Sequence, residues 1–233
     1  MAPSYTTGCS SMANLSMLKL ARRSMFVDLY TEQTVAHIPV AAAADVNTAV
    51  AAAKRAQPAW AARPASARAA VLRKFADLMQ QNVARIAELD RVCLGKPVAA
   101  SVGEIEGACD LVRFFSGQAE LMYGQTSLSR PGQLNITLRQ PFGVVAAIIP
   151  WNFPTLLFCH EVPVAVPAMR SLSRHQRRAH SAESSLGSWR WKPAFPPGII
   201  NVLSGAESTG ELLASHMNIR KMSFTRSIRA DEQ

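Results

Sequence analysis

The first half of the chain shows apolar residues at helical spacing. They recur at three- and four-residue steps over residues 72–86 and again over residues 105–122. An alanine-rich segment precedes them and runs from Asp45 to Pro58. Because residues three and four apart lie on one face of a helix, each segment predicts a helix with a stripe that faces a core.

Polar and helix-breaking residues indicate where these helices begin and end. Asp45 and Ser66 carry side chains that favour the N-cap position, so we expect helices to start there. Proline lacks an amide hydrogen and glycine favours the position after a helix. Pro58, the G-K-P sequence at 95–97 and Gly124 should therefore end the three helices.

The second half of the chain shows strand patterns. Residues 144–149 form an apolar run between Gly143 and Pro150, too short for a full helix. A run that is apolar on both faces is typical of a strand in the middle of a parallel sheet. Short runs at 199–203 and 221–225 predict two further strands of the same sheet.

Helices are expected between these strands. Residues 155–168 read as a crossover helix despite two prolines, and residues 207–216 as a shorter one. Near the start of the chain, residues 28–41 predict two short strands. Strands that alternate with helices predict an α/β fold with a doubly wound parallel sheet of the nucleotide-binding type.

Residues 126–139 predict a protruding β-hairpin. The segment holds a Pro131-Gly132 turn, followed by alternating Leu134, Ile136 and Leu138. An isolated hairpin is marginally stable in water, so a partner or the rest of the domain must support it.

The buried strand leads directly into the most informative stretch, Q-P-F-G-V-V-A-A-I-I-P-W-N-F-P at residues 140–154. Pro150 and Pro154 restrict the backbone of the three residues between them. Asn152 is thereby fixed at the carboxyl end of a buried strand, the edge at which open α/β sheets bind ligands.

This stretch resembles the signature of the aldehyde dehydrogenase family. The phrases W-A-A-R-P-A-S-A-R, E-L-D-R-V-C-L-G-K-P and F-F-S-G-Q-A-E also match that family, and the resemblance covers residues 28–168 and 194–230. It implies an aldehyde dehydrogenase-like fold, with an incomplete Rossmann-type parallel sheet, flanking helices and the protruding hairpin. In the family the equivalent hairpin joins a sheet of a neighbouring subunit, which implies a homo- or hetero-oligomer formed through residues 126–139.

The resemblance also assigns roles at the site. Asn152 would help to stabilise the substrate oxyanion. The residues that would contact an NAD or NADP cofactor are Ile149, Pro150, Trp151 and Ser227. The implied reaction oxidises an aldehyde to a carboxylic acid: a cysteine thiolate attacks the carbonyl, and the resulting thiohemiacetal gives hydride to NAD(P).

Residues 169–193 depart from the family pattern. They are rich in Ser, Arg and His and hold no apolar run of strand length. The family has a β-branched strand and a ribose-binding Lys-Pro-x-Glu element here, and Lys192-Pro193 comes too late to match it. We expect a solvated loop that leaves the strands at 144–149 and 199–203 short of a partner. The abrupt loss and return of resemblance favours a compensated pair of frameshifts or a misjudged intron.

Two further departures bear on activity. Arg226 stands where the family has a glycine beside the cofactor pyrophosphate, and its bulk should interfere with binding. The family's general-base glutamate and nucleophilic cysteine lie further along, beyond the expected end of the resemblance. None of Cys9, Cys93, Cys109 and Cys159 stands in a matching context, in a metal-binding spacing or in a disulfide framework.

The resulting hypothesis is a truncated NAD(P)-dependent oxidoreductase, inactive alone, with its cofactor domain over residues 28–233. Two alternatives stay open. The chain could be a non-catalytic interaction module that associates with a full-length dehydrogenase, or a damaged gene product that never accumulates. The aldehyde, the choice between NAD and NADP and the oligomeric state are not specified by the sequence.

Charge and composition change little in this interpretation. The net charge of +9 suggests nucleic-acid binding, but residues 1–27 contribute +3 and residues 169–193 contribute +5, which leaves +1 for the rest. No basic helix face interleaved with aromatics appears, so we expect no nucleic-acid partner. Without an apolar span of about 20 residues we expect no membrane partner. We expect a cytoplasmic protein. The leader 1–27 diverges from the family and could be disordered, and because it holds basic residues and no acid a mitochondrial location is the alternative.

Overall fold

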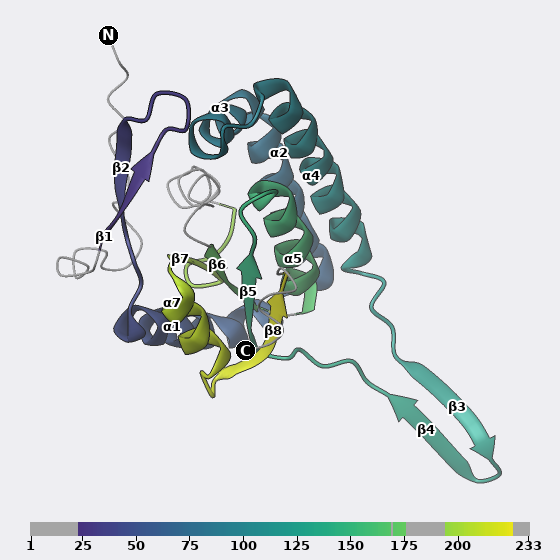
Figure 1. Ribbon diagram of the computed structural model, residues 1–233. Coiled ribbons are helices and arrows are strands. Elements are labelled where there is room, and N and C mark those ends of the chain that lie inside the picture. The colour runs from purple at the N-terminus through teal and green to yellow at the C-terminus, as the bar shows by residue number, and fades with distance from the viewer. Residues whose placement is uncertain (1–22, 169, 176–193, 226–233) are drawn as a thin grey trace.

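The computed structural model describes residues 23–168, 170–175 and 194–225 (Figure 1). Its helices are α1 (Ala43–Ala61), α2 (Ala65–Gln80), α3 (Val83–Leu94), α4 (Val98–Gln118), α5 (Pro154–Ala168) and α7 (Glu207–Ala214). Its strands are β1 (Arg23–Val27), β2 (Thr34–Pro39), β3 (Gln125–Arg130), β4 (Gln133–Thr137), β5 (Val144–Ile149), β6 (Arg170–His175), β7 (Ile200–Ser204) and β8 (Ile219–Phe224).

Four parallel strands form the central sheet in the order β7-β6-β5-β8. From β5 the chain passes outward through β6 to β7, and then returns to place β8 on the other side of β5. The strand order therefore reverses between β5 and β8, which makes the sheet doubly wound. The predicted α/β fold with a Rossmann-type parallel sheet is confirmed.

Strand β5 is buried on both faces, as its apolar run predicted. Val144 and Ala146 pack with α1 and α7 residues in one apolar cluster. Ala147 and Ile149 belong to a larger cluster on the opposite face, built mainly by α2, α3, α4 and α5. Because successive side chains of a strand point to opposite faces, this single strand joins the two cores.

Aromatic side chains form the centre of the larger core. The fully buried ring of Phe75 lies 6.4 Å from Phe158 and 5.4 Å from Phe195, both in edge-on geometry. These three rings connect α2, α5 and the turn before β7. The predicted apolar stripe at 72–86 faces this core, as do Ile105, Ala108 and Val112 of the stripe at 105–122. The end of the second stripe was predicted wrongly, because α4 ends at Gln118 rather than at Gly124 and Met122 is 45% exposed.

The ends of α1 differ from the prediction. Ala42, not Asp45, is the N-cap residue, and the Asp45 carboxylate accepts a hydrogen bond from the Ala42 N–H at 2.9 Å. Pro58 lies inside the helix, which continues to Ala61. One missing backbone hydrogen bond is tolerated because the extra turn buries Trp60 in the core.

The long helix expected from Ser66 is two helices, α2 and α3. Pro64 is the N-cap residue of α2, so Ser66 lies in the first turn. Asn82 breaks the run with a non-helical backbone, and its side-chain amide donates to the Leu78 carbonyl at 2.6 Å. The amide competes for backbone groups in the way that makes asparagine unfavourable within helices.

The first strand of the fold begins earlier in the chain than the predicted start at residue 28. Arg23–Val27, assigned to the leader, forms β1 and pairs antiparallel with β2. Residues 28–41 hence supply one strand rather than two, and Asp28 instead caps the connecting turn by accepting from the Tyr30 N–H at 2.8 Å. The leader residues 1–22 lie outside the described part of the chain.

The expectation of a loop at the start of 169–193 was wrong. Arg170–His175 forms β6, paired in parallel with β5 on one side and β7 on the other. Neither neighbouring strand lacks a partner. Strand formation here follows from the backbone hydrogen bonds of two flanking strands, a tertiary effect that overrides local propensity. Residues 176–193 lie outside the description.

The predicted hairpin is confirmed as β3 and β4, an antiparallel pair whose turn has Gly132 at φ 76°. Every residue of both strands is exposed. Figure 1 shows the hairpin extending well away from the sheet and the helices. Among the described residues, no helix combines the length and apolarity that crossing a bilayer needs.

We expect Phe75→Ala to lower the free energy of unfolding by about 3–5 kcal/mol, because it removes the ring at the centre of the larger core. Urea denaturation followed by circular dichroism measures the change. Phe114→Ala is the matched control, since that ring is 59% exposed on α4. Equal losses in the two variants would contradict this description of the core.

Candidate functional site

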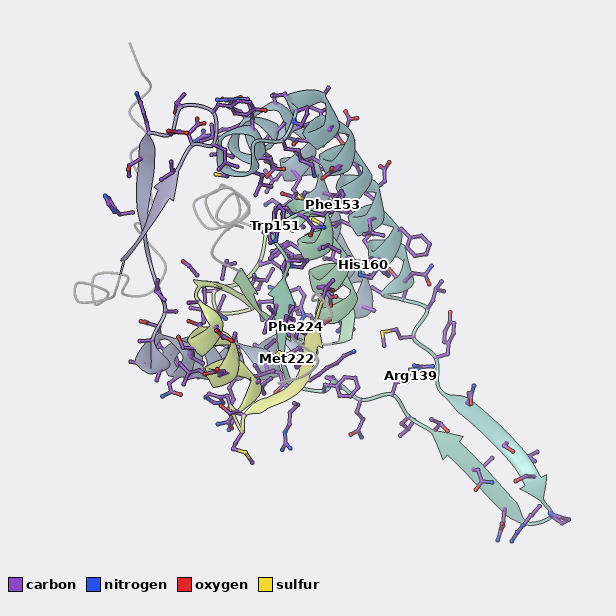
Figure 2. All side chains as sticks on the ribbon, viewed as in Figure 1. Arg139, Trp151, Phe153, His160, Met222 and Phe224 are labelled. Atoms are coloured by element: carbon purple, nitrogen blue, oxygen red, sulfur yellow. The ribbon has the colours of Figure 1, made fainter. Side chains whose placement is uncertain are left out.

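The carboxyl ends of β5 and β8 meet at the point where the strand order reverses. Residues 150–153 connect the end of β5 to α5, which begins at Pro154. Figure 2 shows Trp151 and Phe153 beyond the end of β5, with Phe224 on the neighbouring β8. Open α/β sheets bind ligands in the crevice at such a reversal, so this edge is the candidate site.

The segment 151–153 presents its side chains to solvent. Trp151 is 43% exposed and Phe153 39%, and Asn152 between them is also exposed. The Phe153 carbonyl accepts from the Leu157 N–H at 2.9 Å and so joins the first turn of α5. Two large apolar side chains and a carboxamide are thus available to a ligand at the end of the sheet.

A lysine from outside the motif reaches this segment. Lys96, in the connection between α3 and α4, donates through Nζ to the Asn152 carbonyl at 3.2 Å. The same ammonium forms an ion pair with Glu104 of α4 and lies 4.1 Å from the centre of the Phe153 ring. The sequence indicated Lys96 only as part of a helix end; no local pattern links it to a residue 56 positions later.

The residues predicted to contact a cofactor differ in accessibility. The Ile149 side chain is 1% exposed and packs into the larger core, so only its main chain could reach a ligand. Pro150 is half-buried and Trp151 is exposed. Ser227 and Arg226 lie outside the described residues, just after β8. The cofactor assignments stay predictions.

Comparison with models of known protein families shows which family the chain resembles. A model for the aldehyde dehydrogenase family matches residues 21–233. The chain belongs to the aldehyde dehydrogenase family. The matched range begins before β1 and extends across residues 169–193.

Curated aldehyde dehydrogenases resemble the chain along most of its length. The NADP/NAD-dependent aldehyde dehydrogenase PuuC of Escherichia coli K12 is 31% identical over 212 residues, covering 89% of this chain and 43% of the relative. A glutarate-semialdehyde dehydrogenase of Pseudomonas aeruginosa is 34% identical over 207 residues, covering 87% and 43%. The chain thus spans less than half the length of these relatives.

Solved structures agree with this assignment. The NAD-dependent aldehyde dehydrogenase of Sinorhizobium meliloti matches with a TM-score of 0.83 and 30% identity, over 89% of this chain and 43% of that one. PnpE in complex with nicotinamide adenine dinucleotide gives 0.82 and 31%, over 91% and 44%. These matches confirm the aldehyde dehydrogenase-like fold.

The described thiols of this family member are buried in the core. Burial raises the pKa of Cys93 and of Cys159, and it raises the pKa of Cys109 to about 11. The Cys159 Sγ lies 3.6 Å from the Met79 sulfur, in the packed interior. Because the thiolate is the nucleophile, none of these three groups suits attack on an aldehyde.

We expect the purified chain to form no NADH from a panel of aliphatic and aromatic aldehydes. A thiol with a pKa of about 11 is about one-thousandth ionised at pH 8. Iodoacetamide should accordingly label Cys93, Cys109 and Cys159 only after unfolding in urea, which mass spectrometry checks. A rate of NADH formation that disappears on substituting any one of the four cysteines would show this assignment of the thiols to be wrong.

Proposed function

We propose that this chain acts in the NAD(P)-dependent oxidation of an aldehyde to a carboxylic acid, and that it contributes the end of the sheet that holds the cofactor. One observation carries the proposal. The doubly buried strand β5 ends at the reversal of strand order, and the family signature residues Trp151, Asn152 and Phe153 are exposed there.

The described residues at this edge fit a dinucleotide. The strand order reverses between β5 and β8, which is where such sheets bind nucleotides, and Trp151 offers an exposed aromatic surface beside this point. Ile149 through its main chain, Pro150, Trp151 and Ser227 would hold the cofactor, as the family resemblance implies. When bound, NAD(P) supplies the acceptor for a hydride. NAD and NADP are both compatible with these residues.

Asn152 would act on the substrate. Its exposed carboxamide carries two N–H donors, on a backbone restricted by the prolines on either side. A donor fixed before the reaction stabilises the oxyanion that develops when a nucleophile adds to a carbonyl, and loss of one such donor costs about 10²–10³ in rate. The buried thiols Cys93, Cys109 and Cys159 do not supply that nucleophile.

We expect the chain to bind NAD⁺ or NADP⁺ weakly when it is titrated with either cofactor. Binding should quench the fluorescence of Trp151. The sequence lacks the Lys-Pro-x-Glu element, whose lysine and glutamate would each form a charge-assisted hydrogen bond to the ribose. Each such bond is worth about 1.5–3 kcal/mol, so the absence of both weakens affinity by about 10²–10⁴-fold. Trp151→Phe should abolish the quench. Trp60→Phe, a change in the core, is the matched control and should retain it.

Two results would contradict these expectations. A quench that persists in Trp151→Phe would place the cofactor elsewhere than at the end of β5. Micromolar affinity for the unaltered chain would show that Arg226 and the absent ribose-binding element had been misjudged.

A second candidate function is association with a full-length aldehyde dehydrogenase, and the hairpin favours it. Leu128, Leu134 and Ile136 expose 78%, 59% and 59% of their surfaces on β3 and β4, which lie away from the body of the chain (Figure 1). A hairpin with exposed apolar side chains gains stability when it joins another sheet. The partner would be a homologous subunit or a second copy of this chain.

Ile136→Glu should weaken such an association at least tenfold, since it places a charge on the apolar side of β4. The assay mixes the chain with a purified full-length aldehyde dehydrogenase and follows complex formation by analytical ultracentrifugation. Gln133→Glu introduces the same charge at a neighbouring, already polar position and serves as the control. Absence of any complex with the unaltered chain, or equal loss in both variants, would exclude the hairpin as the interface.

A further inference from the structure

We propose that Lys96, held by Glu104, is a positioning residue for Asn152. The proposal rests on the role given to Asn152 under the proposed function, and it extends the site beyond the signature motif. Lys96 and Glu104 contribute no group to the aldehyde or the cofactor. They fix the main chain from which the Asn152 carboxamide projects.

The backbone places Lys96 firmly. Gly95 is the C-cap residue of α3 at φ 67°, and Pro97 is the N-cap residue of α4 at φ −58°. The Gly95 carbonyl also accepts a hydrogen bond from the Tyr30 hydroxyl at 2.9 Å. Because both helix ends are fixed, the Cα atom of Lys96 has a defined position. The long side chain of Lys96 is only 16% exposed.

The ammonium of Lys96 meets three groups, each of which attracts positive charge. Nζ donates to the Glu104 carboxylate and, at 3.2 Å, to the Asn152 carbonyl, and it lies 4.1 Å from the centre of the Phe153 ring. A lysine ammonium has three donors. The arrangement therefore uses the ammonium fully, and two of its three contacts are to the candidate site.

These contacts fix consecutive peptide groups of the site. Lys96 holds the Asn152 carbonyl, and the Leu157 N–H holds the Phe153 carbonyl within the first turn of α5. Because both carbonyls are held, the peptide plane that follows Asn152 has a fixed orientation relative to α5. The Lys96 contact involves only the main chain of Asn152, so the carboxamide of Asn152 stays exposed.

A purely structural role for the ion pair is the competing explanation. Lys96 and Glu104 could simply fasten the start of α4 to the preceding connection. The two explanations differ in what an exchanged pair would do. Lys96→Glu with Glu104→Lys keeps an ion pair, but it puts a carboxylate against the Asn152 carbonyl and the Phe153 ring, both of which repel negative charge.

The test reads the position of Trp151 by fluorine NMR in chains labelled with 5-fluorotryptophan, with its resonance assigned from Trp151→Phe. Lys96→Met should move or broaden the Trp151 resonance by more than its linewidth, and Lys96→Arg should largely preserve it. The exchanged pair should recover the melting temperature that Lys96→Met lowers, without recovering the Trp151 resonance. The buried Trp60 gives an internal control, because its resonance reports whether the core is intact.

Two outcomes would overturn the proposal. In the first, Lys96→Met leaves the Trp151 resonance unchanged while that of Trp60 shows a folded core. In the second, the exchanged pair restores both the melting temperature and the Trp151 resonance, which is the result of a purely structural ion pair. Neither cofactor nor aldehyde is present in these measurements. A failure here therefore leaves the proposed function standing, and a failure of the cofactor titration leaves this result standing.

Discussion

Burial of β5 on both faces is the constraint on which the rest of the structure depends. Val144 and Ala146 need the cover of α1 and α7, whereas Ala147 and Ile149 need the layer of α2 to α5. A strand in the middle of a parallel sheet also has partners on both edges, which β6 and β8 supply. Six consecutive apolar residues thus demand two helical layers and two neighbouring strands, and the end of the strand becomes the place where all of these meet.

The parts of the fold that could be predicted are those whose information is local. The stripe of Leu72 and Phe75 and the run at β5 have the period of their own element, so the sequence indicates both type and buried face. Strand β6 could not be found in this way. Its segment has no apolar run, and it is a strand because β5 and β7 offer hydrogen bonds on either side. Pro58 shows the same limit, since burial of Trp60 outweighs a local helix-breaking signal.

The candidate site likewise has one part that could be predicted from local sequence and one part that could not. The position of Asn152 was predictable, because a strand end followed by two prolines fixes it locally. The contact from Lys96 was not, because it joins residues 56 positions apart and depends on how α4 packs against α5. The sequence context already argues against Cys109 and Cys159 as nucleophiles, but the physical reason becomes visible only in the fold. Desolvation raises a thiol pKa according to depth in the core, which no sequence spacing records.

The helical layer therefore does more than cover the sheet. Gly95 ends α3 and Pro97 precedes α4, and because both helices pack into the core these two ends fix the backbone of Lys96. Lys96 in turn holds the Asn152 carbonyl at the carboxyl end of β5. The segment 151–153 is accordingly anchored twice to the same core, once through β5 and once through the α3–α4 connection. An exposed loop with two such anchors keeps a defined geometry at the surface, which is what a donor that must meet a developing charge requires.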